Sequence, residues 1–76
     1  MIHFMDYKTI GTQQYYISTV YTFDNGWETM VFESENKAVI SWKEKYQKLY
    51  PNGQKAAKGH NYVLFNLEEC LANYKG

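Results

Sequence analysis

The segment YYISTVYTFDNGWETMVF, residues 15–32, decides the fold of this chain. Both halves of the segment consist largely of β-branched and aromatic residues, which suit a pleated, half-buried strand. Asn25-Gly26 stands between them, and this pair favours a type I′ turn, because both central residues of that turn need a positive φ. The sequence therefore predicts a β-hairpin from about Tyr15 to Phe32 with Asn25 and Gly26 as its two loop residues.

A two-residue loop fixes which hairpin residues share a face of the sheet, because side chains alternate along each strand. The more apolar face, which we expect to point into the core, carries Ile17, Thr19, Tyr21, Phe23, Met30 and Phe32. The opposite face carries Ser18, Val20, Thr22, Asp24, Trp27, Thr29 and Val31. This second face is too apolar for plain solvent surface, so we expect another element or a partner to cover it. A bulged three-residue turn would mix the two faces and is the less favoured alternative.

The segments on either side of the hairpin predict further β-structure. Residues 2–5 have the composition of a short edge strand. Residues 38–42 predict a third strand, and residues 43–50 either continue as a strand or form a short helical turn. Pro51-Asn52-Gly53 ends this region in both cases, because these residues favour turns.

The last third of the chain predicts an amphipathic helix from about Gln54 to Tyr74, because apolar residues recur there at three- and four-residue steps. Gly59 in its interior costs about 1 kcal/mol relative to alanine. Residues 62–65 also have strand propensity, and Asn66 with Glu69 forms a capping-box pattern. A strand followed by a helix that begins near Asn66 therefore stays open as an alternative.

Together these elements predict a single small α+β domain over residues 1–76. Its expected architecture is an antiparallel β-meander of three or four strands packed against one C-terminal α-helix. A chain of this length is near the lower limit for a domain without staples. Cys70 is the only cysteine, which excludes an internal disulfide. No signal-peptide pattern and no apolar run of membrane-spanning length occurs, so we expect a cytoplasmic protein without a membrane partner.

The charges are unevenly distributed, although the net charge is zero. Residues 1–36 hold five acidic residues and one lysine, whereas residues 37–76 hold seven lysines and three acidic residues. There is no arginine, which counts against sequence-specific reading of nucleic acids. The lysine–aromatic segment 37–58 still predicts one alternative function, binding of single-stranded nucleic acid. Its expected contacts are Lys43, Lys45, Lys48 and Tyr46.

His60 and Cys70 are the candidates for chemistry, and neither has the partners that chemistry requires. A metal site needs three or four convergent ligands, and the sequence offers none at ligand spacing from His60. We expect a hydrogen-bonded core histidine beside Gly59, whose missing side chain would let the helix approach the sheet closely. Cys70 is expected to be a small core residue. The sequence thus predicts no catalytic residue, no cofactor, no metal site and no enzymatic activity.

Two groups of residues are candidates for binding a partner. Glu28, Glu33 and Glu35 surround the end of the second predicted strand and either form an acidic patch or discourage strand addition at an edge. Tyr62 and Phe65 fall off the apolar stripe of the predicted helix, which indicates a partner or self-association surface. The expected partner-binding residues are Trp27, Glu28, Glu33, Glu35, Tyr62 and Phe65. Trp27 is the residue that we would mutate first.

Three motifs carry a family resemblance, and they are Ile17-Ser18-Thr19-Val20, Glu28-Thr29-Met30-Val31-Phe32 and Ala56-Ala57-Lys58-Gly59-His60. Together they resemble a family of small bacteriophage and prophage proteins of unknown function, which have an S-T-V strand, an E-T-M-V-F strand and a helix with A-x-x-G-H. The similarity covers residues 16–63, and the chain departs from the family pattern after His60.

This resemblance implies a phage or prophage origin, residence in the bacterial host cytoplasm, and a helix around His60. It implies no reaction and no cofactor. Small phage proteins commonly bind a host protein, so we expect a non-enzymatic protein that binds a host macromolecule. Inhibition of a host defence system, in the manner of an anti-CRISPR protein, is the particular case. A structural homo-oligomer or homodimer is a further alternative.

Overall fold

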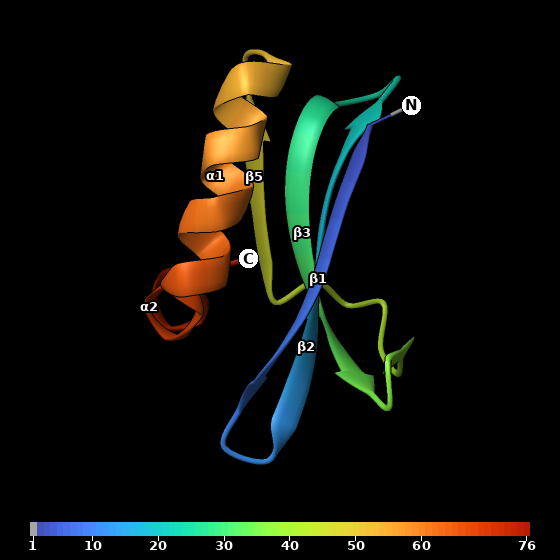
Figure 1. Cartoon of the computed structure of the whole chain (residues 1–76), viewed down its shortest axis with the longest axis vertical. Helices are drawn as coiled ribbons and strands as arrows, with labels where there is room; N and C mark the ends of the chain where they lie inside the picture. Colours follow the sequence, from blue (N-terminus) through green and yellow to red (C-terminus); the bar gives the residue numbers. More distant parts are fainter. Residues whose placement is uncertain (1) are drawn as a thin grey trace.

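Five strands and two helices form two layers in the computed structural model, which describes residues 2–76. Figure 1 shows both helices on one side of the sheet. The elements are β1 His3–Ile10, β2 Gln13–Thr22, β3 Gly26–Glu35, β4 Ala38–Val39, β5 Tyr46–Tyr50, α1 Gly53–Phe65 and α2 Leu67–Asn73. The predicted α+β class, with an antiparallel sheet packed against C-terminal helical structure, is confirmed.

β3 is the centre of the sheet, because three other strands pair with it. β1, β2 and β3 are antiparallel neighbours in chain order. The other edge of β3 is shared by β4, near Glu35, and by β5, which pairs with residues 27–31. The predicted first strand therefore extends to Ile10, and the predicted third strand contributes only Ala38–Val39. Residues 46–50 form the strand that the sequence left open.

The β2–β3 hairpin forms, but its predicted register is wrong. Thr22 pairs with Gly26, so residues 23–25 form a three-residue loop. Gly26 has a φ of 70°, which suits glycine in loops of this kind. The Thr22 hydroxyl oxygen accepts a hydrogen bond of 3.1 Å from the Asn25 backbone N–H and closes the loop. The two consecutive residues with positive φ that a type I′ turn requires occur instead at Asn36 and Lys37, between β3 and β4.

The register change moves alternate β3 residues to the other face of the sheet. Ile17 faces Val31, and Thr19 faces Thr29. All four side chains are completely buried, although Thr29 and Val31 were expected on the outer face. Trp27, also expected there, lies on the helix side against Gly53.

Three residues of the expected inward face lie elsewhere, and a fourth, Tyr21, keeps the predicted face but is not buried. Phe23 is fully exposed in the loop, and Tyr21 is about half exposed. Met30 and Phe32 lie at even positions of β3 and face away from the helices, because Thr29 and Val31 face toward them. Both faces of the hairpin are apolar, so the hydrophobic pattern does not distinguish the two registers.

Residues 53–73 are helical in two pieces that meet at Asn66. The alternative with a strand over residues 62–65 is wrong, and the single continuous helix is interrupted. Asn52 begins α1, since its side-chain oxygen accepts a hydrogen bond of 2.9 Å from the Lys55 N–H. The Asn66 side chain donates to the Tyr62 carbonyl at the end of α1, so the predicted capping box does not form. No helix within residues 2–76 has the length and apolar character needed to cross a bilayer.

The core lies between the sheet and the helices. Ile17 and Val31 from the sheet pack with buried residues of the helical stripe. The buried helical residues are Ala56, His60, Val63, Leu67 and Cys70. All of them belong to the three- and four-residue pattern in the sequence, so the predicted buried side of the helical region is confirmed.

Candidate functional site

A chain of hydrogen bonds runs through the core from β3 to β1. Thr29 Oγ1 lies 2.5 Å from Thr19 Oγ1, which lies 2.6 Å from His60 Nδ1. His60 Nε2 lies 2.7 Å from Asp6 Oδ2, and the Asp6 carboxylate is half exposed. The His60 ring also packs against Phe4, with ring centroids 5.7 Å apart. The expected hydrogen-bonded core histidine is confirmed, because His60 is only 2% exposed.

A hydroxyl, an imidazole and a carboxylate in sequence are also the groups of a hydrolytic triad. A nucleophile must reach its substrate, however, and the Thr19 side chain is 0% exposed. This arrangement therefore ties α1 to two strands and presents no reactive group at a surface. Among residues 2–76, no three His, Cys, Asp or Glu side chains gather as they would around a metal ion.

Cys70 and Tyr46 meet where α2 packs on β5. Cys70 is buried, as expected, and burial raises the pKa of its thiol. Burial, together with the neighbouring Cys70, raises the pKa of Tyr46 from 10.0 to about 12. The Tyr46 ring also packs against Tyr74, with centroids 5.7 Å apart. Tyr46 is thus turned toward the helices, and its ring is not free to stack on a base as the nucleic-acid alternative requires.

The raised pKa of Tyr46 has a consequence for stability at alkaline pH. A folded-state pKa of about 12 against 10.0 means that the Tyr46 contribution to stability is complete below pH 10. It is lost as the pH rises from 10 through 12. We expect Tyr46→Phe to lose less stability over this window than the parent protein. Urea unfolding at a series of pH values measures this, with Tyr21→Phe as the exposed control; equal losses in parent and Tyr46→Phe would contradict it.

The predicted acidic patch does not form as one surface. Glu28 is buried, where its carboxylate accepts hydrogen bonds from Gln47 Nε2 at 3.0 Å and Asn25 Nδ2 at 3.3 Å. Glu33 lies five positions along the same strand, so its side chain points to the opposite face. Glu35 is exposed at the far end of β3. Glu28 is therefore a packing residue and not part of an accessible acidic cluster.

The remaining predicted partner-binding residues lie on the helix side. The Trp27 ring is half buried, with its edge toward Tyr21 at a centroid distance of 5.8 Å. Tyr62 and Phe65 are exposed on α1, as expected. The Tyr62 hydroxyl donates to Glu69 on α2 at 3.1 Å. Trp27 is thus a packing residue at the start of α1, and it does not share a surface with Phe65 at the other end of this helix.

The face of the sheet that the helices leave open carries Ser18 and Val20, which the sequence predicted outward, together with Met30 and Phe32, which it predicted inward. Figure 1 shows no helix on this side. We call it the open face. It is formed by alternate residues of four strands together with Trp42. Its apolar and aromatic members are Met5, Tyr7, Tyr16, Val20, Met30, Phe32, Trp42 and Leu49, and its polar members are His3, Thr9, Gln14, Ser18, Thr22, Glu28, Ser34 and Gln47.

Two aromatic pairs lie on the open face. Tyr7 and Tyr16 lie side by side with ring centroids 5.1 Å apart, and Trp42 stands edge-on to Phe32 at 5.0 Å. Trp42 is 71% exposed, Met5 56% and Leu49 52%. The acidic Glu28 is the one ionisable Asp, Glu or Lys at the alternate strand positions of this face within residues 2–76. Within residues 2–76, the strand positions of the open face therefore expose large apolar side chains and no lysine or acidic side chain.

The lysines of the nucleic-acid alternative do not lie together on the open face. Lys43 is exposed in the segment between β4 and β5, and Lys45 is half buried there. Lys48 lies on the helix side of β5, since it shares the alternate positions of Tyr46 and Tyr50. No family model, no curated protein and no solved structure matches this chain. The function proposed for this chain therefore depends on the open face and on the positions of the lysines.

Proposed function

We propose that this chain is a non-enzymatic protein-binding module whose open face docks on another protein. The observation that carries the proposal is an exposed, uncharged, aromatic-rich sheet face opposite the helical layer. In keeping with the family resemblance, the partner is a bacterial host protein and the chain is phage- or prophage-encoded. The activity that we propose for the chain is inhibition of a host defence protein.

The chemistry of the open face favours protein over nucleic acid. Tyrosine, tryptophan and methionine are enriched at the centres of protein interfaces, where lysine and glutamate are depleted. A phosphodiester backbone would instead require cations at the contact, and the strand positions of this face carry none. A sheet is also preorganised, so binding orders few side chains. An apolar patch on a folded protein partner is the complementary surface.

Trp42 provides the sharpest test, because its exposed ring can be removed with little effect on the fold. We expect Trp42→Ala and Leu49→Lys each to weaken binding of the partner by about tenfold to a hundredfold, the range for a central interface residue. The measurement is affinity capture from bacterial lysate with the tagged protein, followed by titration of the captured protein.

Phe65→Ala is the matched control, because Phe65 is equally exposed but lies on α1. The proposal requires a stoichiometric partner that is lost with the Trp42 and Leu49 variants and kept with Phe65→Ala. A partner that is retained by both open-face variants would overturn it. Light scattering tests the alternative that the chain forms a homodimer through the open face. A concentration-dependent dimer that Leu49→Lys abolishes would assign the open face to self-association and not to a host protein.

A further inference from the structure

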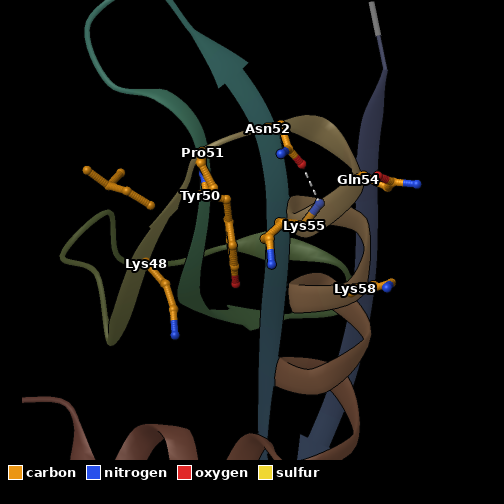
Figure 2. Close-up of a pocket in the computed structure, with 8 residues that line it drawn as sticks. Lys48, Tyr50, Pro51, Asn52, Gln54, Lys55 and Lys58 are labelled. Atoms are coloured by element: carbon orange, nitrogen blue, oxygen red, sulfur yellow. Dashed lines mark hydrogen bonds between the residues drawn. The ribbon is translucent and has the colours of Figure 1, made fainter.

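A separate pocket lies on the helix side, between the end of β5 and the first turns of α1. It has a volume of about 460 Å³, which is within the range of small-molecule sites. Its lining residues come from one continuous segment, namely Lys48, Leu49, Tyr50, Pro51, Asn52, Gln54, Lys55 and Lys58. Figure 2 shows the Lys48 and Lys55 side chains on either side of the Tyr50 ring, with both amino groups extending in the direction of its hydroxyl.

The pocket is lined by three lysines and by no acidic residue. The sequence has no Asp or Glu between Glu44 and Glu68. Within residues 2–76, none of these lysines forms an ion pair, since the ion pair found there joins Asp6 and His60. The first turn of α1 also lacks an acidic residue, so the positive end of the helix dipole adds to the field.

The remaining walls fit a planar group attached to an anion. The Tyr50 ring stands between two lysines, and aromatic rings provide stacking surfaces for nucleobases. Pro51 and Leu49 add apolar contact, while Gln54 carries a side-chain amide that can hydrogen-bond to a base edge. Lysine is a common ligand of phosphate groups. The pocket therefore combines cations, an aromatic ring and amides within the space of one nucleotide.

We infer that this pocket binds a nucleotide, with its phosphate held by Lys48 and Lys55 and its base packed against Tyr50. Lys58 lies one turn further along α1 and adds to the phosphate-binding charge. The site lies on the helix side of β5, because Lys48 and Tyr50 occupy the alternate positions that face the helices, and Leu49 is the residue that it shares with the open face. Its ligand is either a free nucleotide or the phosphorylated end of a single strand, which share this chemistry.

The test is an NMR titration of the full chain at low salt with four probes. These are AMP, adenosine, inorganic phosphate and a 5′-phosphorylated oligothymidylate. We expect AMP to shift the backbone amides of residues 48–58, and to bind at least tenfold more tightly than adenosine or inorganic phosphate. A double Lys48→Gln/Lys55→Gln variant should lose about tenfold to a hundredfold in AMP affinity, because each lysine contributes a charge-assisted contact. Added salt should weaken binding.

Lys43→Gln is the matched control, since it removes the same charge outside the pocket. Retained affinity in this variant supports the site, and equal loss in both variants would overturn it as non-specific charge attraction. Absence of shifts with AMP and with the oligonucleotide would also overturn it, as would equal binding of AMP and inorganic phosphate. An oligonucleotide that binds more tightly than AMP supports the site and identifies the strand end as ligand. Trp42→Ala should bind AMP normally. A failure of the nucleotide-binding proposal can therefore be distinguished from a failure of the protein-binding proposal.

Discussion

Replacement of His60 by alanine is expected to lower the free energy of unfolding by about 3 kcal/mol. The imidazole is buried and has a hydrogen-bond partner at each nitrogen, Thr19 on β2 and Asp6 on β1. The substitution opens a cavity against Phe4 and removes both contacts at once. A loss of this size is a large share of the stability of a small domain, which starts at about 5 kcal/mol. Urea unfolding followed by circular dichroism measures it.

Two further variants separate the hydrogen bonds from the lost volume. His3→Ala removes an exposed histidine that contacts Ser18, and it should change stability by less than about 0.5 kcal/mol. In a Thr19→Val background, His60→Ala should cost about 1 kcal/mol less than in the parent, because one of its contacts is already absent. Costs that simply add would show that the Thr19–His60 hydrogen bond contributes nothing.

Replacement of Gly59 by alanine is expected to destabilise the protein by about 2 kcal/mol, although alanine is the better helix former. A Cβ at position 59 would overlap the Tyr50 ring, so this ring would have to leave its place between β5 and α1. The loss of Tyr50 packing then exceeds the gain in helix propensity. Thermal unfolding measures the change, and Asn61→Ala, at an exposed position of the same helix, is the matched control with little expected effect.

The sign of the Gly59 effect should reverse when Tyr50 is removed. In a Tyr50→Ala background, Gly59→Ala no longer meets the ring and should raise stability by about 1 kcal/mol, the propensity difference alone. If Gly59→Ala still destabilises the protein in this background, the added Cβ must clash with a group other than the Tyr50 ring.

The hairpin illustrates what the sequence does and does not determine. Strand propensity is local, so the existence of β2 and β3 was predictable from residues 15–32. Their register was not, because it depends on which of two apolar faces meets the helices, and on the Thr22 side chain closing a longer loop. The Asn25-Gly26 pair favours more than one loop length, so the loop sequence alone does not select between the two registers.

The helical third was predictable to a similar degree. The buried positions follow directly from periodicity, and Gly59 was rightly expected at a close approach to the sheet. A helix that begins near Asn66 was one of the two alternatives, and α2 does begin there, but it follows another helix and not the strand with which it was paired.

The open face and the nucleotide pocket could not be predicted from local pattern. Both depend on β5 pairing with β3, which brings residues 46–50 beside residues 27–31. Lysine and tyrosine spacing suggested phosphate binding in the sequence, but it favoured Tyr46, which packs against the helices. Tyr50, four residues later and on the same side of β5, also packs against α1 but lines the pocket. The lysines and tyrosines in this segment indicated the kind of ligand, but their neighbours in the folded structure could not be predicted from the sequence.

The central position of β3 sets the order in which a nascent chain can mature on the ribosome. β1, β2 and β3 leave the exit tunnel first, yet one edge of β3 waits for β5 and one face waits for α1. Until residues 46–73 emerge, Ile17 and Val31 have no helical cover, and most of one β3 edge is free to pair with another chain. A fragment that ends before β5 is therefore expected to aggregate and not to form a smaller folded domain.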